Sequence, residues 1–284
     1  MIEARPSRTA LRVAMRRAAH QLFDTPKVLD DPIAMEIIGP HGAEKLRLER
    51  PDAFGKYGLG IRAFMVARSR YAEDALARAV ARGATQYVIL GAGLDTFPYR
   101  NPYPESALRV FEVDYPATQE WKRRNLREAQ IAVPPSVTYA PVDFEHQTLP
   151  DGLRLAGFDA SKPTFFSWLG VTMYLTDEAI LSTLRFIAST PRGGGVAFDY
   201  AVPIETLSWM GRVAMRMMMQ RVAAAGEPFR TFFESAALIA RLKDLGFRGI
   251  EDLGADELNE RYFKNRTDKL RVVGRLGRLI SAEV

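Results

Sequence analysis

The stretch Tyr87-Val88-Ile89-Leu90-Gly91-Ala92-Gly93-Leu94-Asp95-Thr96 decides the fold. It opens with an apolar run that is short enough to be a strand buried on both faces. The run then breaks into two glycines one residue apart, which lack a Cβ and let backbone N–H groups approach a ligand closely. A buried parallel strand that ends in such a turn is typical of a nucleotide-type site in an open α/β sheet.

The turn does not match the dinucleotide fingerprint G-x-G-x-x-G/A. That pattern needs a small third residue for close packing of helix on strand. Thr96 occupies this place, and Pro98 follows it. Two glycines occur in many tight turns, so a ligand-binding loop and a purely structural turn are equally open from the turn alone.

Composition sets broad limits on the function. The chain has 284 residues, 47% of them hydrophobic and 26% charged, which is ordinary for a soluble globular protein. It has no cysteine, which excludes disulfides, thiolate metal sites and a cysteine nucleophile. Its histidines, His20, His41 and His146, lack metal-ligand spacing, so we expect no metal. Neither an apolar leader nor a membrane-length apolar run is visible, and we expect a cytoplasmic protein without a membrane partner.

The net charge of +5 is compatible with anionic substrates or with loose attraction to nucleic acid. The basic residues are spread along the chain and are mostly interleaved with acids. The densest basic stretch, 264–278, is better interpreted as a solvated surface than as a nucleic-acid site. We expect no nucleic-acid partner, and the sequence leaves the oligomeric state open.

Apolar spacing in the first part of the chain is helical. A short predicted helix ends at Gly39-Pro40, and a long one stops at Gly83. We expect an N-terminal helical segment, residues 1–83, packed beside the sheet. The predicted helices cover residues 7–23, 31–38 and 61–82.

From Tyr87 onward, strand and helix patterns alternate, which implies right-handed crossovers and a doubly wound, mostly parallel sheet. The last two predicted strands leave no room for a crossover helix, so we expect an antiparallel hairpin at the sheet edge. An α/β fold with a Rossmann-like seven-stranded sheet and a terminal antiparallel strand is the layout of a class I methyltransferase, although fold alone does not fix function. The predicted strands are 86–90, 109–113, 137–140, 164–170, 195–200, 247–253 and 270–275. The predicted helices between them are 115–130, 176–189 and 233–245.

One segment, 204–229, interrupts the alternation and is rich in methionine. Flexible methionines suit an adaptable apolar surface, and a helix packed on the core and a lid over a substrate pocket are equally open. The single domain therefore divides into the N-terminal helical segment, a Rossmann-like core and a lid-like insertion. The core comprises residues 84–203 and 230–284. The marked side chains of the insertion are Trp209, Met210, Met215, Met217, Met218 and Met219.

Acidic residues follow the second and third predicted strands. Asp114 lies roughly 20 residues past the glycine turn, where an acid can accept hydrogen bonds from ribose hydroxyls. Its alternative role is to cap the following helix, but its pairing with the glycine turn favours the ribose. Asp143 and Phe144 end the third strand at the same crevice, where the carboxylate could accept from an adenine amine and the Phe144 N–H could donate to a ring nitrogen. Taken alone, this pair is a loop acid beside a core aromatic.

Together these motifs resemble the leucine carboxyl methyltransferase family. Within that family the chain is similar to bacterial S-adenosyl-L-methionine-dependent methyltransferases, which include polyketide carboxyl O-methyltransferases. The resemblance covers roughly residues 8–200. It rests on Gly91-Ala92-Gly93-Leu94-Asp95-Thr96 with Tyr99-Arg100, Phe111-Glu112-Val113-Asp114-Tyr115-Pro116, Val142-Asp143-Phe144, Ala67-Arg68-Ser69-Arg70-Tyr71, Leu29-Asp30-Asp31-Pro32 and Gly170-Val171-Thr172-Met173-Tyr174-Leu175.

The resemblance implies S-adenosyl-L-methionine as the methyl donor. Arg68 would bind the methionine carboxylate, for which the planar fork of arginine is well suited. The turn Gly91-Ala92-Gly93 would line the methionine and ribose, Asp114 would hold the ribose, and Asp143 with Phe144 would hold the adenine.

Three features limit how far the roles of the family's residues can be assigned to this chain. Without the resemblance, Arg68 would be interpreted as a solvated helix arginine, and Arg12 and Arg100 are weaker candidates for anionic contacts. Several family members carry an acid on the fourth strand, where this chain has Ser167-Trp168-Leu169. For Trp168, a place in the core is favoured over a role in shaping the pocket.

A carboxylate acceptor needs no general base, because its reference pKa near 4 leaves it ionised at neutral pH. Methyl transfer to it needs in-line placement, worth up to roughly 7–11 kcal/mol, and a site from which water is excluded. We therefore predict an S-adenosyl-L-methionine-dependent O-methyltransferase that acts on a small-molecule carboxylic acid, and we assign no catalytic residue. The alternatives are a non-catalytic binding or regulatory protein with the same fold and, less favoured, an NAD(P)-dependent oxidoreductase.

Overall fold

The computed structural model describes most of the chain. The described residues are 8–48, 55–144, 146–206 and 228–284, with Trp209, Arg212, Val213, Arg216, Met219 and Gln220. Most of the segment 204–229, including Met210, Met215, Met217 and Met218, lies outside them. The assignment of that segment as a lid-like insertion therefore stays a prediction.

A seven-stranded sheet forms the centre of the molecule, in the order β3-β2-β1-β4-β5-β7-β6. The first five strands pair in parallel, and β7 is antiparallel to both of its neighbours. The order reverses between β1 and β4, and ligands bind at such a switch point in open α/β sheets. The predicted fold class is thus confirmed. The strands are β1 (Gln86–Leu90), β2 (Arg109–Asp114), β3 (Val137–Pro141), β4 (Thr164–Trp168), β5 (Gly195–Ala201), β6 (Arg248–Leu253) and β7 (Gly277–Glu283).

The antiparallel pair β6–β7 lies at one edge of the sheet, as predicted, but the predicted last strand, 270–275, is wrong. A short helix, α10 (Ala255–Tyr262), follows β6, and β7 begins only at Gly277. The side chain of Asn259 on α10 accepts from the Val272 N–H at 2.8 Å and donates to its carbonyl at 3.0 Å. The backbone N–H and carbonyl of Val272 therefore bond to a side chain of α10 and not to a neighbouring strand.

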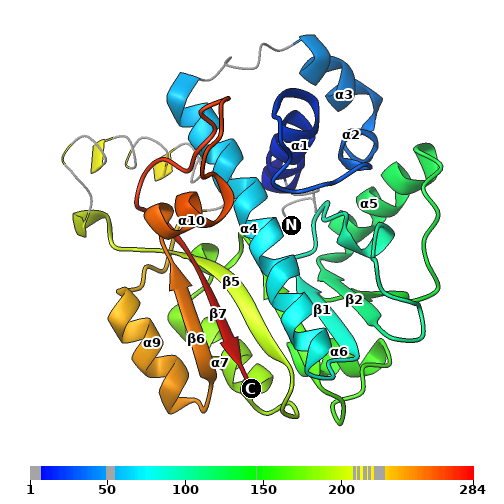
Figure 1. Ribbon diagram of the computed structural model, residues 1–284. Helices are drawn as coiled ribbons and strands as arrows, with labels where there is room; N and C mark the ends of the chain where they lie inside the picture. Colours follow the sequence, from blue (N-terminus) through cyan, green and yellow to red (C-terminus); the bar gives the residue numbers. More distant parts are fainter. Residues whose placement is uncertain are drawn as a thin grey trace.

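The first three N-terminal helices, α1 (Arg8–Phe23), α2 (Ala34–Ile37) and α3 (Gly39–Leu48), gather at one end of the sheet (Figure 1). The fourth, α4 (Gly55–Ala81), runs from that end along the sheet. The short helix α2 ends before Gly39-Pro40, as predicted, but a further helix, α3, which was not predicted, starts at Gly39. Gly39 has φ +76°, which breaks the chain direction between α2 and α3, and Pro40 occupies the first turn, where proline is favoured.

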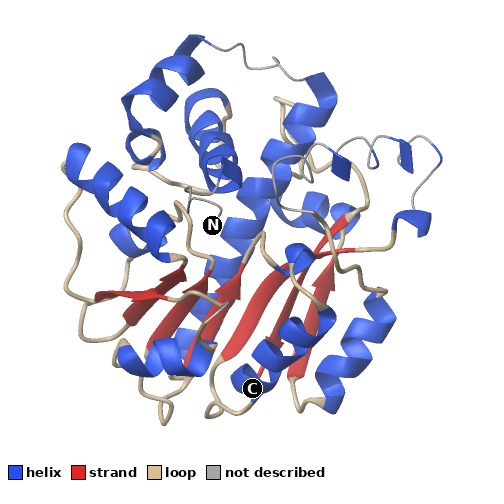
Figure 2. Cartoon of the chain, turned by 180° about the vertical axis from the view of Figure 1, so that it is seen from behind, coloured by secondary structure: helices blue, strands red, loops and turns tan. Residues whose placement is uncertain are grey.

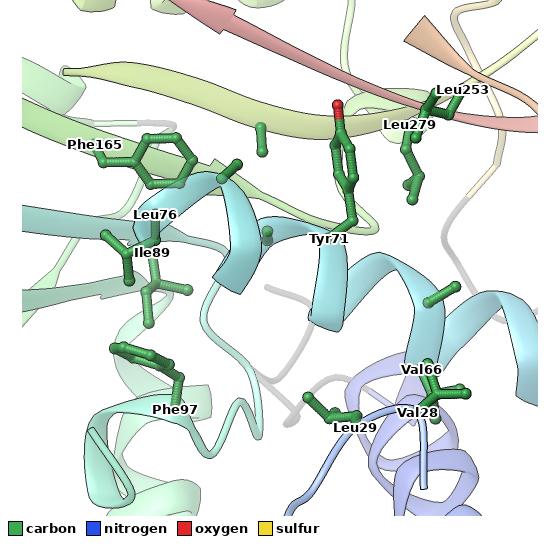
Figure 3. Close-up of a cluster of buried hydrophobic side chains, with 14 of the residues drawn as sticks. Val28, Leu29, Val66, Tyr71, Leu76, Ile89, Phe97, Phe165, Leu253 and Leu279 are labelled. Atoms are coloured by element: carbon green, nitrogen blue, oxygen red, sulfur yellow. The ribbon is translucent and has the colours of Figure 1, made fainter. Parts of the chain in front are cut away.

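Helix α4 covers one face of the sheet. Its Tyr71 and Leu76 are fully buried in a cluster that includes Phe165 of β4 and Leu279 of β7 (Figure 3). The Tyr71 hydroxyl keeps a partner there, since it donates to Ser281 Oγ at 2.8 Å. The long N-terminal helix thus packs directly on the sheet, as expected.

Helices also cover the opposite face (Figure 2). The side chains of β1 alternate between the two faces, with Ile89 in the α4 cluster and Val88 and Leu90 in the second cluster. The helices of this second cluster are α6 (Leu149–Leu155), α7 (Asp177–Ala188) and α9 (Ser235–Asp244). The remaining long helix, α5 (Pro116–Glu128), follows β2 and packs against α2. Among the described helices, none combines the length and apolarity that crossing a membrane requires.

Candidate functional site

A cavity of about 400 Å³ opens at the carboxyl ends of β1, β2 and β4, under α1. Six of the seven residues predicted to bind the methyl donor line this cavity together, and the exception is Asp143. The Asp143 carbonyl accepts from the backbone N–H groups of His146 and Gln147, and its side chain is not part of the cavity wall. The predicted residues in the wall are Arg68, Gly91, Ala92, Gly93, Asp114 and Phe144.

The glycine turn adopts a backbone conformation that residues other than glycine rarely adopt. Gly91 has φ +68° and Gly93 has φ +46°. A Cβ on Gly91 would lie 2.5 Å from Val171 Cγ2, and a Cβ on Gly93 would lie 3.1 Å from the Cβ of Ala10 in α1. The glycines are therefore required both by conformation and by the close approach of neighbouring chain on two sides.

The carboxylate of Asp114 ties the end of β2 to the glycine turn. It accepts from the Gly93 N–H at 2.6 Å and from the Tyr115 N–H at 2.7 Å. Among the described residues both of its bonds go to residues that precede α5, which begins at Pro116, and none goes into the first turn of that helix, so the helix-cap alternative is not supported. Burial raises the pKa of Asp114 above its ordinary value, although both N–H bonds act in the opposite direction.

Arg68 projects from α4 into the wall of the cavity and is 5% exposed, so its interpretation as a solvated helix arginine is wrong. Its Nη1 lies 2.8 Å from Oδ2 of Asp199 on β5. The other carboxylate oxygen of Asp199 accepts from the Gly170 N–H at 2.5 Å. The Nε of Arg68 is buried and has no hydrogen-bond partner among the described residues.

Asp199 was not predicted, because it lies in no recognised motif; it bonds two residues of the cavity wall, Arg68 and Gly170. A signal for it exists: Asp199 is the one acid in the otherwise uncharged strand Gly195–Ala201 and is 1% exposed. A buried acid needs a partner. That partner, Arg68, is 131 residues away in the chain, beyond the reach of local pattern.

Arg17 of α1 is the second missed residue of the cavity. Its Nη2 donates to the Leu94 carbonyl at 2.5 Å, and its Nε lies 3.3 Å from Oδ2 of the buried Asp31. The Thr96 hydroxyl donates to the same Asp31 oxygen at 2.7 Å. Thr96, which departs from the dinucleotide fingerprint, thus joins the glycine turn to the segment between α1 and α2.

The weaker candidates lie elsewhere. Arg100 pairs with Glu73 and lies 3.4 Å from Asp31, outside the cavity wall, and Arg12 is exposed. Trp168 is 3% exposed beside Phe198 and also lines the cavity, so it belongs to the core and to the pocket.

The titratable groups of the wall offer little general-base chemistry. No histidine or lysine is among the described lining residues, and the acids there are Asp95 and Asp114. Burial would raise the pKa of Asp95, but Arg17, Lys122 and the Phe97 N–H together hold it below the ordinary value. The buried His20 is committed elsewhere: its Nδ1 lies 2.8 Å from Asp24 Oδ2, and its Nε2 accepts from the Val28 N–H.

Comparison with known proteins gives the chain its family. Residues 10–188 match the model of the leucine carboxyl methyltransferase family. The chain is 36% identical over 288 residues to a Bacillus subtilis (strain 168) protein named "Putative S-adenosyl-L-methionine-dependent methyltransferase YktD", and the match covers 93% of each chain.

Two solved structures share the fold at low identity. One is a putative methyltransferase from Thermobifida fusca YX, with a TM-score of 0.56, 14% identity and coverage of 99% of this chain and 96% of that one. The other is a duf574 family protein from Streptomyces avermitilis MA-4680, with a TM-score of 0.53, 17% identity and coverage of 96% of both chains. The predicted class, the S-adenosyl-L-methionine-dependent methyltransferases, is confirmed by the family and the relative: the chain belongs to the leucine carboxyl methyltransferase family.

Proposed function

We propose that this protein transfers the methyl group of S-adenosyl-L-methionine to a carboxylate oxygen of a small organic acid. One observation carries the proposal: the cavity combines an arginine, a glycine turn and a strand-terminal aspartate, and its described wall holds no histidine or lysine. Such a wall suits an acceptor that is already ionised at neutral pH.

The residues present fit the methyl donor. The glycine turn lines the cavity with backbone that carries no side chain, and the buried Nε of Arg68 has no partner among the described residues. Arg68 would bind the methionine carboxylate, Asp114 the ribose hydroxyls, and Phe144 the adenine. Asp143 is the least supported of the seven predicted contacts, because its side chain is not part of the wall. A volume of about 400 Å³ is within the usual range for small-molecule sites.

The donor, when bound, supplies a methyl group made electrophilic by the sulfonium. The chain itself contributes orientation and exclusion of water. Arg68 and Asp114 would fix the amino-acid end and the ribose of the donor, and α1 covers the glycine turn closely enough to place Ala10 beside Gly93. Val13, Leu169 and Val171 add apolar surface to the wall, which favours neutralisation of opposite charges.

A phenol or amine acceptor is less favoured because it would need a proton acceptor. Both carboxylate oxygens of Asp114 already accept backbone N–H groups, and Asp95 accepts from the Phe97 N–H at 2.8 Å. The lowered pKa of Asp95 makes it a weak base. A carboxylate acceptor avoids this requirement.

Alkaline hydrolysis of the product tests the proposal. The protein is incubated with methyl-labelled donor and panels of small carboxylic acids, phenols and amines. A carboxyl methyl ester releases labelled methanol in mild base, whereas aryl methyl ethers and methylamines keep the label. Base-stable label would contradict the proposed acceptor. Tight donor binding without turnover on any panel would favour the non-catalytic alternative.

A further inference from the structure

The carboxylate of Asp199 divides its two oxygens between two elements that meet at the cavity. Oδ2 receives Nη1 of Arg68 on α4, and Oδ1 receives the N–H of Gly170, directly after β4. The backbone carbonyl of Asp199 accepts in turn from the Thr172 hydroxyl at 2.6 Å. Asp199 therefore holds an arginine side chain and a loop of the wall in one fixed relation.

The guanidinium of Arg68 is held from a second side by Gly170. A Cβ on Gly170, which has φ +74°, would lie 2.9 Å from both Nη1 and Nη2 of Arg68. The absence of a side chain at 170 thus provides the space that the guanidinium occupies. With Nη1 bound to Asp199, the buried Nε is left without a partner among the described residues, on a side chain that lines the cavity. An arginine with a fixed plane and an N–H that no described residue uses is suited to bind a planar anion.

The charge of Asp199 has a further effect on the site. The donor carries a sulfonium and an ammonium beside its carboxylate, and an unpaired guanidinium in the same cavity would repel both cations. The negative charge of Asp199 offsets this repulsion, while the remaining N–H groups of Arg68 can still form hydrogen bonds. Ordering the side chain before binding also reduces the entropy that is lost on binding.

We propose that Asp199 is a positioning residue, which orients Arg68 to receive the carboxylate of the methyl donor. This inference rests on the role of Arg68 in the proposed function and adds to it the residue through which Arg68 acts. It is independent of the identity of the acceptor.

A pair of ligands separates positioning from general stability. S-adenosylhomocysteine carries the amino-acid carboxylate, whereas 5′-methylthioadenosine keeps the nucleoside and the sulfur but lacks it. By calorimetry, Asp199→Asn should weaken S-adenosylhomocysteine about tenfold or more and change 5′-methylthioadenosine less than about twofold. Arg68→Met should show the same selectivity, and the double variant should be no weaker than Arg68→Met alone.

Asp252→Asn is the matched control. Asp252 pairs with Arg278 at 3.0 Å between β6 and β7, is mostly buried and does not line the cavity. It should alter stability without distinguishing the two ligands.

The outcomes are distinct. If Arg68→Met loses the carboxylate ligand selectively and Asp199→Asn does not, the inference is overturned while the role of Arg68 stands. If Arg68→Met shows no selectivity, the assigned role of Arg68 fails and the inference fails with it. Should Asp199→Asn not fold, Gly170→Ala displaces the same guanidinium from its other side and should reproduce the selective loss; equal weakening of both ligands would count against the proposal.

Discussion

Helix α4 carries two buried arginines, Arg62 and Arg68, that are equally exposed, at 5%, and equally paired with buried aspartates. Arg62 binds Asp24 through two bonds, Nε to Oδ2 at 2.9 Å and Nη2 to Oδ1 at 2.7 Å. Arg68 gives only Nη1 to Asp199 and keeps a buried Nε unpaired among the described residues. The Arg62–Asp24 pair uses both carboxylate oxygens and joins α4 to the end of α1. Arg68, in the cavity wall, keeps an N–H that no described residue uses. Burial and charge are alike in both, so the hydrogen-bonding capacity left unused is what distinguishes Arg68, the arginine proposed to bind the donor, from Arg62.

The largest expected effect comes from Arg62→Met. It leaves Asp24 as a buried carboxylate without its main cation, which should lower the free energy of unfolding by about 3–5 kcal/mol. Urea unfolding measures the loss. Arg68→Met should also destabilise, but only Arg68→Met should lose affinity for S-adenosylhomocysteine relative to 5′-methylthioadenosine. Equal ligand selectivity in the two variants would break the comparison.

Asp114 extends the comparison from arginines to acids, because its carboxylate is expected to have lone pairs left for the ribose. Asp114→Ala should weaken S-adenosylhomocysteine by about 2 kcal/mol, which is about 30-fold, since hydrogen bonds to a charged group are lost. Circular dichroism should show an intact fold. Calorimetry that gives unchanged affinity would remove Asp114 from the site.

Thr96 resembles Arg62 in this respect, since its hydroxyl serves the buried Asp31 rather than the cavity. Thr96→Val keeps the volume and removes the bond to the buried Asp31 and the longer bond from Arg100 Nε, so the unfolding free energy should fall by about 1–2 kcal/mol. Donor affinity, measured by calorimetry on the folded protein, should stay within about twofold. A large loss of affinity would place Thr96 among the binding residues.

The smallest effect concerns pH and separates the two acids of the wall. The pKa of Asp95 is lowered on folding, so its contribution to stability is present above its unfolded pKa and is lost as pH falls through its folded pKa. The pKa of Asp114 is raised, so its contribution has the opposite sign and is lost as pH rises through its folded pKa. Unfolding free energies of wild type, Asp95→Asn and Asp114→Asn over the acid range measure both slopes. Parallel slopes for the two variants would contradict this assignment.

Most of the sheet was predictable because buried strands and amphipathic helices leave local signals. The first five strands fall within two residues of their predicted ends. Helix α6 was missed because Gly152 interrupts its pattern; a Cβ there would lie 2.3 Å from Val142 Cγ2, so packing requires the glycine. The threonine cap of this helix, in which Thr148 accepts from the Asp151 N–H, was a usable signal.

The site too has a part that could be predicted from the sequence and a part that could not. Motif residues after successive strands meet because the carboxyl ends of parallel strands share one edge, and this much follows from the sequence. The partners of those residues do not follow. Asp199 and Arg17 act through contacts with residues 131 and 77 positions away, and a single sequence records no such pairing.

Because α1 packs closely on the glycine turn, occupancy of the cavity is linked to the motion of a helix that is distant in sequence from the strands of the site. Local unfolding of α1 breaks the Arg17 bond to Leu94 and uncovers the turn, so a ligand that fills the space beneath slows this opening by mass action. Amide hydrogen exchange along α1 is therefore an internal gauge of how full the cavity is, whatever acceptor the protein methylates.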